Sequence, residues 1–93
     1  PNIWSLHQNY PNPFNPTTVL RYDLPLNAFV KLTVFDMYGK IVKTLVNKKK
    51  DSGSQFIQWD ATNNQGNYVS AGVYLYRIEM GDFKQTKKMI FLK

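Results

Sequence analysis

The chain has 93 residues, with twelve Lys or Arg against six Asp or Glu and a formal net charge of +6. Hydrophobic residues make up 43% and aromatic residues 15%, which suits one small folded core and excludes a disordered chain or a large enzyme scaffold. The absence of cysteine excludes disulfides, thiolate nucleophiles and cysteine-ligated metals.

Residues 1–16 form an N-terminal segment that is rich in proline and asparagine. The prolines hold the residues before them in extended geometry, and asparagine side chains can bond back to the local backbone. We expect a stiff, kinked segment that caps one end of the fold, with Tyr10 and Phe14 free to enter the core. Because the first residue is Pro1 and not methionine, we also expect a piece of a larger precursor.

From residue 17 onward, apolar and polar side chains alternate with the period of two that is typical of β-strands. The predicted strands are residues 17–24, 29–36, 40–46, 55–60, 72–80 and 83–92. No segment keeps a helical period over ten residues. About seven short strands separated by turn signals predict an all-β fold, an immunoglobulin/fibronectin-like antiparallel β-sandwich over residues 17–93.

Three aromatic residues are assigned to the structural core of this sandwich. Trp59 lies on a central strand, where its ring can pack between the sheets. Tyr74 and Tyr76 share one face of the strand 72–80 with other apolar residues. Tyr74 also follows a glycine corner, so its hydroxyl could bond back to the backbone, although the spacing is one residue shorter than expected for a tyrosine corner.

Turns and loops carry most of the remaining charge. Residues 36–39 predict a hairpin loop in which Asp36 accepts backbone N–H groups and Gly39 supplies a positive φ. Residues 47–53 predict a basic loop, with Lys48, Lys49 and Lys50 at a solvated tip.

A second basic cluster lies on the last strand, where Lys84, Lys87 and Lys88 precede an apolar run over residues 89–92. Both faces of the strand turn apolar there. The run is either buried on both sides or held ready for another surface. A terminal strand with a basic stem is also a suitable handle for a receptor that reads strand edges.

Residues for catalysis or metal binding are scarce. His7 is the only histidine and has no carboxylate or nucleophile near it in sequence, which favours a surface or linker role. Asp36 and Asp60 close strands, where they accept backbone N–H groups. Oxygen-bearing residues alternate in 60–66, but the glycine and glutamate of a calcium loop are missing. We therefore expect neither an enzyme nor a cofactor or metal.

The basic charge raises nucleic acid, anionic membrane and anionic polysaccharide as partners. Ten lysines but only two arginines, Arg21 and Arg77, disfavour nucleic acid, because specific phosphate and base contacts rely on arginine. The apolar runs are too short to span a bilayer.

Several short sequence motifs, taken in their order along the chain, indicate a known family. They are Asn9–Thr18 (NYPNPFNPTT), Val34–Lys40 (VFDMYGK), Trp59–Asp60, Gly66, Ser70–Tyr76 (SAGVYLY) and Gln85–Lys93 (QTKKMIFLK). The chain resembles the C-terminal sorting domain of the Por, or type IX, secretion system. It is similar also to the immunoglobulin-like domain of the flagellar hook-capping protein.

The resemblance implies a non-catalytic module fused after a secreted cargo domain. Its implied partners are the type IX translocon and a surface sortase, and its implied route runs through the periplasm to the cell surface or the extracellular medium. The resemblance places recognition near the C-terminus, on residues that here are Lys87, Lys88, Met89, Ile90, Phe91, Leu92 and Lys93.

Alternatives from other classes remain open at this stage. One is a structural spacer or a carbohydrate-binding accessory module of a secreted glycosidase, and another is an assembly domain of the hook-capping type. Sugar binding would need a row of exposed aromatic rings. The candidates are Tyr22, Tyr38, Tyr68 and Phe83, of which three suit core or turn packing instead.

Overall fold

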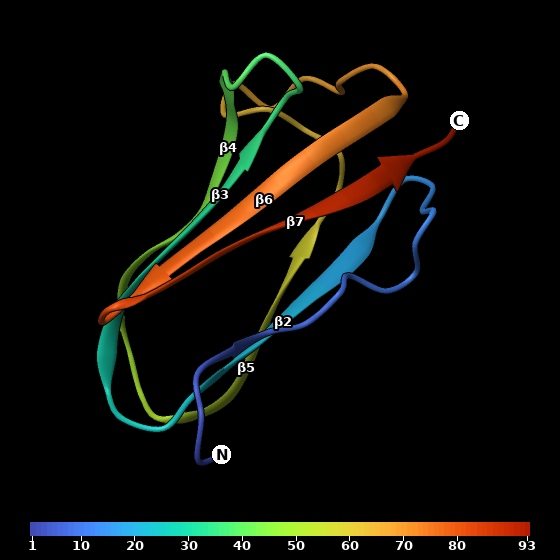
Figure 1. Ribbon diagram of the computed structural model, residues 1–93. Helices are drawn as coiled ribbons and strands as arrows, with labels where there is room; N and C mark the ends of the chain where they lie inside the picture. Colours follow the sequence, from blue (N-terminus) through green and yellow to red (C-terminus); the bar gives the residue numbers. More distant parts are fainter.

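The computed structural model describes residues 1–93 as seven β-strands without a helix. The strands are β1 (Ser5–Leu6), β2 (Thr18–Leu24), β3 (Ala28–Phe35), β4 (Ile41–Lys50), β5 (Gly53–Trp59), β6 (Gly72–Met80) and β7 (Phe83–Phe91). A three-stranded sheet, β1-β2-β5, faces a four-stranded sheet, β4-β3-β6-β7, and all pairs are antiparallel (Figure 1). The predicted all-β, immunoglobulin-like sandwich is confirmed, and only the two-residue β1 has no counterpart in the prediction.

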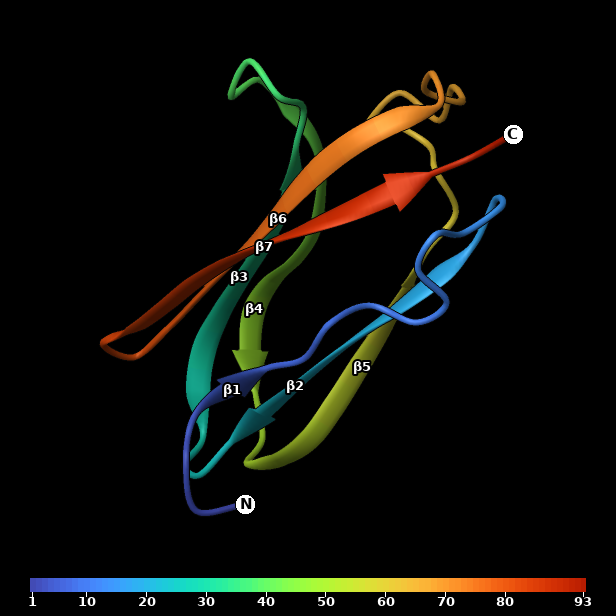
Figure 2. The ribbon, with the colours of Figure 1, turned by 45° about the vertical axis from the view of Figure 1, so that its right-hand side comes forward.

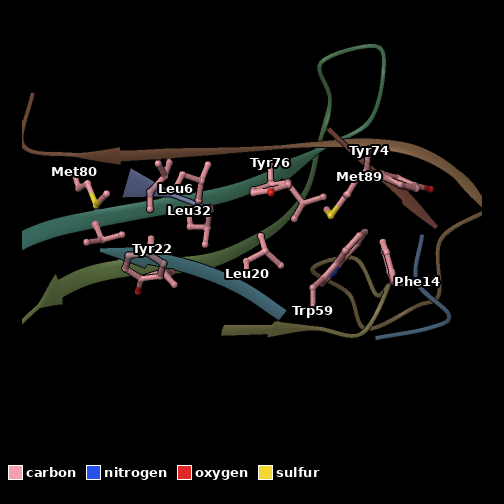
Figure 3. Packing of buried hydrophobic residues seen from close by; sticks show 14 of the residues in the cluster. Leu6, Phe14, Leu20, Tyr22, Leu32, Trp59, Tyr74, Tyr76, Met80 and Met89 are labelled. Atoms are coloured by element: carbon pink, nitrogen blue, oxygen red, sulfur yellow. The ribbon is translucent and has the colours of Figure 1, made fainter. Parts of the chain in front are cut away.

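The core lies between the two sheets because each strand turns every second side chain inward. Seventeen buried hydrophobic residues form one cluster. Trp59, Phe14 and Met89 lie together at one end of it, and Tyr22 and Met80 lie at the other (Figure 3).

The aromatic end of the core is organised around Trp59, which is fully buried. Its ring centroid lies 5.7 Å from that of Phe14 and 5.5 Å from that of Tyr74. The indole Nε1 donates a hydrogen bond to the carbonyl of Thr62 (2.9 Å), and the Tyr74 hydroxyl donates to the carbonyl of Ser70 (2.6 Å). The predicted core positions of both residues are confirmed, and the Tyr74 hydroxyl bonds back to the backbone despite the short spacing.

The N-terminal segment runs along one side of the sandwich between the two sheets (Figure 2). A backbone bridge from Tyr10 to Val19 joins it to β2, and a bridge from Phe14 to Phe91 joins it to β7. It therefore closes a side of the fold and does not cap an end. Phe14 is buried as expected, whereas Tyr10 is 81% exposed, so the expectation that Tyr10 enters the core was wrong.

The Tyr76 hydroxyl anchors this segment from the opposite sheet. It donates a hydrogen bond to the carbonyl of His7 (2.8 Å) and accepts one from the backbone N–H of Asn9 (2.9 Å). Asn9 is itself buried, and its side-chain amide donates to the hydroxyl of Thr18 (3.0 Å). Burial raises the pKa of Tyr76 to about 12, although the bond from Asn9 opposes the shift. The tyrosine thus serves both the core and the segment.

The prediction of a basic loop over residues 47–53 was wrong for its first half. β4 continues to Lys50, and Lys48, Lys49 and Lys50 pair with Val30, Phe29 and Ala28 of β3. β4 is the edge of its sheet, where lysines suit a strand because their charges discourage pairing with another edge. Three consecutive charged residues lack alternation, so the pattern concealed the strand.

The predicted hairpin between β3 and β4 is confirmed. The carboxylate of Asp36 accepts the backbone N–H groups of Tyr38 (2.9 Å) and Lys40 (3.0 Å), and Gly39 has a φ of +84°. A side chain at Gly39 would be strained in that conformation.

Candidate functional site

The terminal strand β7 turns one face into the core and the other outward. Met89 and Phe91 are 0% and 1% exposed, whereas Lys88, which precedes Met89, is exposed, and Ile90, which lies between the two buried residues, is half-buried. The apolar run over residues 89–92 is therefore not buried on both sides, because only the face with Met89 and Phe91 is buried. Met89 and Phe91 hold the strand in place and are not available to a partner while the domain is folded.

The other residues of the predicted recognition set are accessible to different degrees. Leu92 is 51% exposed and Lys93 is exposed, both beyond the end of β7. Lys87 is half-buried and pairs with Tyr76 of β6. The structure therefore brings Lys88, Ile90, Leu92 and Lys93 to one accessible region and separates Met89 and Phe91 from them.

Part of the free edge of β7 is covered by the N-terminal segment. The side chain of Gln8 donates to the carbonyl of Lys88 (2.8 Å), and Asn12 Oδ1 accepts from the backbone N–H of Ile90 (3.0 Å). The backbone N–H of Phe14 donates to the Ile90 carbonyl (3.0 Å). A receptor that adds a strand here would have to displace these contacts. Over residues 88–92, a partner can thus reach the outward side chains but not the covered edge.

Residues of β6 and β3 extend the accessible face of β7 across the sheet. Val73 pairs with Ile90, and Leu75 pairs with Lys88 on one side and with Phe35 on the other. Val73, Leu75 and Phe35 are half-buried on the outer face of the sheet. We call Lys88, Ile90, Val73, Leu75 and Phe35 the β7 face. The period of two placed Val73 and Leu75 opposite the core, but only the strand pairing shows that they adjoin β7.

His7 is brought to a carboxylate that is distant in sequence. Its Nε2 donates to Asp23 Oδ2 (2.7 Å), and the Ser54 hydroxyl donates to Asp23 Oδ1 (2.8 Å). The carboxylate lies between the other two groups, whereas a catalytic triad needs the imidazole in that place. His7 therefore does not activate Ser54. The contact between His7 and Asp23 joins residues 16 positions apart, and no local pattern indicates it.

The pKa of Asp23 lies below its usual value. Burial alone would raise it, but the hydrogen bonds from His7 and Ser54 and the positive charges of His7 and Arg21 outweigh burial. The folded protein thus favours the ionised carboxylate, which ties β1's end to β2 and β5.

The loop over residues 60–66 satisfies its oxygen atoms within the chain. Asp60 Oδ1 accepts from the hydroxyl (2.6 Å) and the backbone N–H (3.2 Å) of Thr62, and Asn63 Oδ1 accepts from two backbone N–H groups. The Thr62 hydroxyl contributes most to a lowered pKa of Asp60, ahead of the opposing effect of burial. No three His, Cys, Asp or Glu side chains gather where they could hold a metal ion. No helix in the structure is long and apolar enough to span a membrane.

The aromatic residues considered for sugar binding do not form a row. Tyr22 is buried, Tyr38 lies at the tip between β3 and β4, and Tyr68 lies in the connection before β6. Phe83 begins β7 and is half-buried against the core. Tyr10 and Phe56 are instead 81% and 71% exposed, and sequence reasoning did not consider either for sugar binding.

Comparison with known proteins identifies relatives of this arrangement. A model described as the FlgD Ig-like domain matches residues 15–82, most of the chain. No curated protein matches this chain in sequence.

Three solved structures share the fold. The dimeric latent PorU of Porphyromonas gingivalis superposes with a TM-score of 0.78 and 23% identity over 99% of this chain and 9% of PorU. PorZ, described as an essential surface component of the type IX secretion system of P. gingivalis, gives 0.63 and 19% over 97% of this chain and 11% of PorZ. FlgD from P. aeruginosa gives 0.62 and 23% over 80% of this chain and 57% of FlgD. The chain therefore spans about a tenth of the first two proteins.

Proposed function

This chain belongs to the FlgD Ig-like domain family, and from that premise we propose that it is a non-catalytic sorting module of the type IX secretion system. In this proposal, the module directs a protein fused before it through the periplasm and an outer-membrane translocon to the cell surface. A surface sortase would then act upstream of the domain. The finding that supports a secretion role is the shared fold with PorZ, a surface component of that system.

The observation that carries the proposal is the accessible, lysine-flanked end of the chain. Lys88 and Lys93 are exposed, and Ile90 and Leu92 add apolar surface next to them. Two core anchors, Met89 and Phe91, fix the strand so that Lys88 and Ile90 face outward, with Leu92 and Lys93 following at its end. A rigid strand that presents charges beside apolar groups loses little conformational entropy on binding, which favours recognition by a folded receptor.

The test must use point substitutions and not truncation. Removing residues 87–93 would take Met89 and Phe91 out of the core, so a loss of delivery would report unfolding. A periplasmic reporter fused to residues 1–93 is expressed in a host with the type IX system, and its surface fraction is measured. The variant Lys88→Glu/Lys93→Glu is compared with Lys48→Glu/Lys49→Glu, which makes the same charge change on the edge of β4.

We expect the β7 variant to lose most of its surface delivery and the β4 variant to keep it. Thermal unfolding of both purified variants controls for folding. Equal delivery of the two, with equal stability, would refute the role of the C-terminal residues.

A structural or assembly role is the second candidate, and the family match favours it. The matched model and the P. aeruginosa FlgD structure both describe an Ig-like domain. In that case, exchanging the domain for an unrelated Ig-like sandwich of similar size would leave the location of the fused protein unchanged. A sorting module cannot be exchanged in this way, so the same reporter assay separates the two candidates.

A further inference from the structure

The outer face of the three-stranded sheet carries a hollow that the sorting role does not use. A cavity of about 400 Å³ lies there, lined by Gln8 and Tyr10 of the N-terminal segment and by Val19 and Arg21 of β2. It lies on the opposite sheet from the β7 face, and the link between the two surfaces is the hydrogen bond from Gln8 to the Lys88 carbonyl.

The strand period explains why these side chains gather. Val19 and Arg21 are outward positions of β2, between buried neighbours. Tyr10 is bridged to Val19 on one side, and Phe56 of β5 stands directly opposite Arg21 on the other. Because Tyr10 and Phe56 are 81% and 71% exposed, two open aromatic rings flank one arginine.

The guanidinium of Arg21 is free to bind a ligand. The two ion pairs of the structure are His7–Asp23 and Arg77–Glu79, and Arg21 is in neither. Asp23 is the next outward residue on β2, and its carboxylate already accepts hydrogen bonds from His7 (2.7 Å) and Ser54 (2.8 Å). The positive charge of Arg21 helps to lower the pKa of the Asp23 carboxyl, but its N–H donors make no hydrogen bond or ion pair and remain available to a ligand.

This arrangement determines the chemistry of the occupant. A planar guanidinium matches a carboxylate with two parallel hydrogen bonds. Exposed aromatic rings pack against the C–H faces of sugar rings, whose hydroxyl groups meanwhile stay in contact with water. Two exposed rings next to the cavity suit a chain of such units, and the net charge of +6 favours an acidic one.

We propose that this face binds an acidic polysaccharide, with a sugar carboxylate on Arg21 and sugar rings against Tyr10 and Phe56. The side chain of Gln8 borders the same cavity; its Nε2 already donates to Asn9 Oδ1 (2.7 Å) and to the Lys88 carbonyl (2.8 Å), so Oε1 is the atom it offers a ligand. Nucleic acid fits less well, because a single arginine can neutralise only one phosphate on this face.

The test titrates the 93-residue chain with tetragalacturonate and follows binding by NMR shifts and calorimetry. The neutral methyl ester of the same tetrasaccharide is the matched ligand. We expect the acidic ligand to bind at least about tenfold more tightly, as a charge-assisted pair should. The largest shifts should fall on the backbone amides of Tyr10, Val19, Arg21 and Phe56. Equal affinity for the two ligands would overturn the proposal.

Matched substitutions separate the site from the general basic charge. Arg21→Gln should weaken binding of the acidic ligand about tenfold, and Tyr10→Ala or Phe56→Ala several-fold. Arg77→Gln removes the same charge from the other sheet, and Tyr38→Ala removes a ring that is 97% exposed at a distant tip. Neither control should change the affinity. Equal losses for Arg21→Gln and Arg77→Gln would mean that only net charge matters, and would refute the site.

Other occupants of the face give different results. Concentration-dependent dimerisation that Tyr10→Ala abolishes, without any binding of tetragalacturonate, would assign the face to a second copy and overturn the proposal. The sorting proposal is tested on β7, which these substitutions leave intact. Each proposal can therefore fail without the other.

Discussion

Replacing Tyr76 by phenylalanine tests whether the N-terminal segment is an integral part of the fold. The hydroxyl of Tyr76 is the acceptor for the backbone N–H of Asn9 and the donor to the carbonyl of His7. Phenylalanine keeps the ring in the core but removes both bonds. The N–H of Asn9, which is only 2% exposed as a residue, then loses its partner without gaining contact with water.

The expected loss of stability follows from these two bonds. A buried donor left unsatisfied costs about 1–3 kcal/mol, and the second bond contributes about 1 kcal/mol. We therefore expect Tyr76→Phe to lower the free energy of unfolding by about 2–4 kcal/mol. For a domain of this size, that lowers Tm by about 8–30 °C.

Urea and thermal unfolding followed by circular dichroism measure the effect. Tyr74→Phe is the matched control, because it removes one hydroxyl that bonds only the carbonyl of Ser70 and should cost about 1 kcal/mol. Amides of the N-terminal segment should also exchange faster in Tyr76→Phe. A loss no larger than that of Tyr74→Phe, with unchanged exchange, would show that the hydroxyl does not hold the segment.

The same substitution has a signature at alkaline pH. Burial raises the pKa of Tyr76 to about 12, whereas an unfolded tyrosine titrates near 10. The folded state therefore holds the proton more tightly, and stability falls as pH rises from about 10 to about 12. The difference in stability between the wild type and Tyr76→Phe should shrink over that range. A constant difference would contradict the buried, neutral hydroxyl.

Three further predictions concern other contacts of the N-terminal segment. The pKa of Asp23 is lowered, so its contribution to folding stability is present above a pH of about 4 and is lost as pH falls below that value. Asp23→Asn should therefore reduce the fall in unfolding free energy at acid pH. An unchanged acid slope would count against the hydrogen bonds of Asp23 with His7 and Ser54. Phe14→Ala should cost about 3–5 kcal/mol in urea unfolding, since Phe14 is buried and stacks on Phe91, and a loss under about 1 kcal/mol would place it outside the core. Asn12→Ala should speed amide exchange of Ile90 without a large change in Tm, and unchanged protection would mean that the β7 edge is covered without Asn12.

The strands could largely be predicted, because their cause is local. Alternation alone predicts the bounds of Gly72–Met80, and the turn residues predict the Asp36–Gly39 hairpin. Trp59 and Tyr74 could be assigned to the core because large aromatic groups on inward positions have few other places to go.

Two features of the fold could not be predicted from the sequence. One has a composition without the alternation of a strand, and the other depends on contacts between residues far apart in the chain. Lys48, Lys49 and Lys50 continue β4 because β3 pairs with them, while their own pattern resembles a loop. The hydrogen bond from Gln8 to the Lys88 carbonyl joins residues that are 80 positions apart, and no local sequence pattern predicts it.

Of the two candidate surfaces, the one on β7 could be predicted in part, and the one around Arg21 could not. The accessible half of β7 follows from the period of two once Met89 and Phe91 are known to face the core. The pairing of Arg21 with Phe56 and of Tyr10 with Val19 depends on which strands are neighbours, which only the assembled sheet reveals.

The central claim is that accessible side chains at the C-terminal end direct a fused protein to the cell surface. The surface fraction of a reporter fused to residues 1–93 tests it directly in a host with the type IX system. The account predicts that Lys88→Glu/Lys93→Glu leaves most of the reporter inside the cell, while Lys48→Glu/Lys49→Glu reaches the surface as the wild type does. Equal surface fractions for two equally stable variants would contradict it.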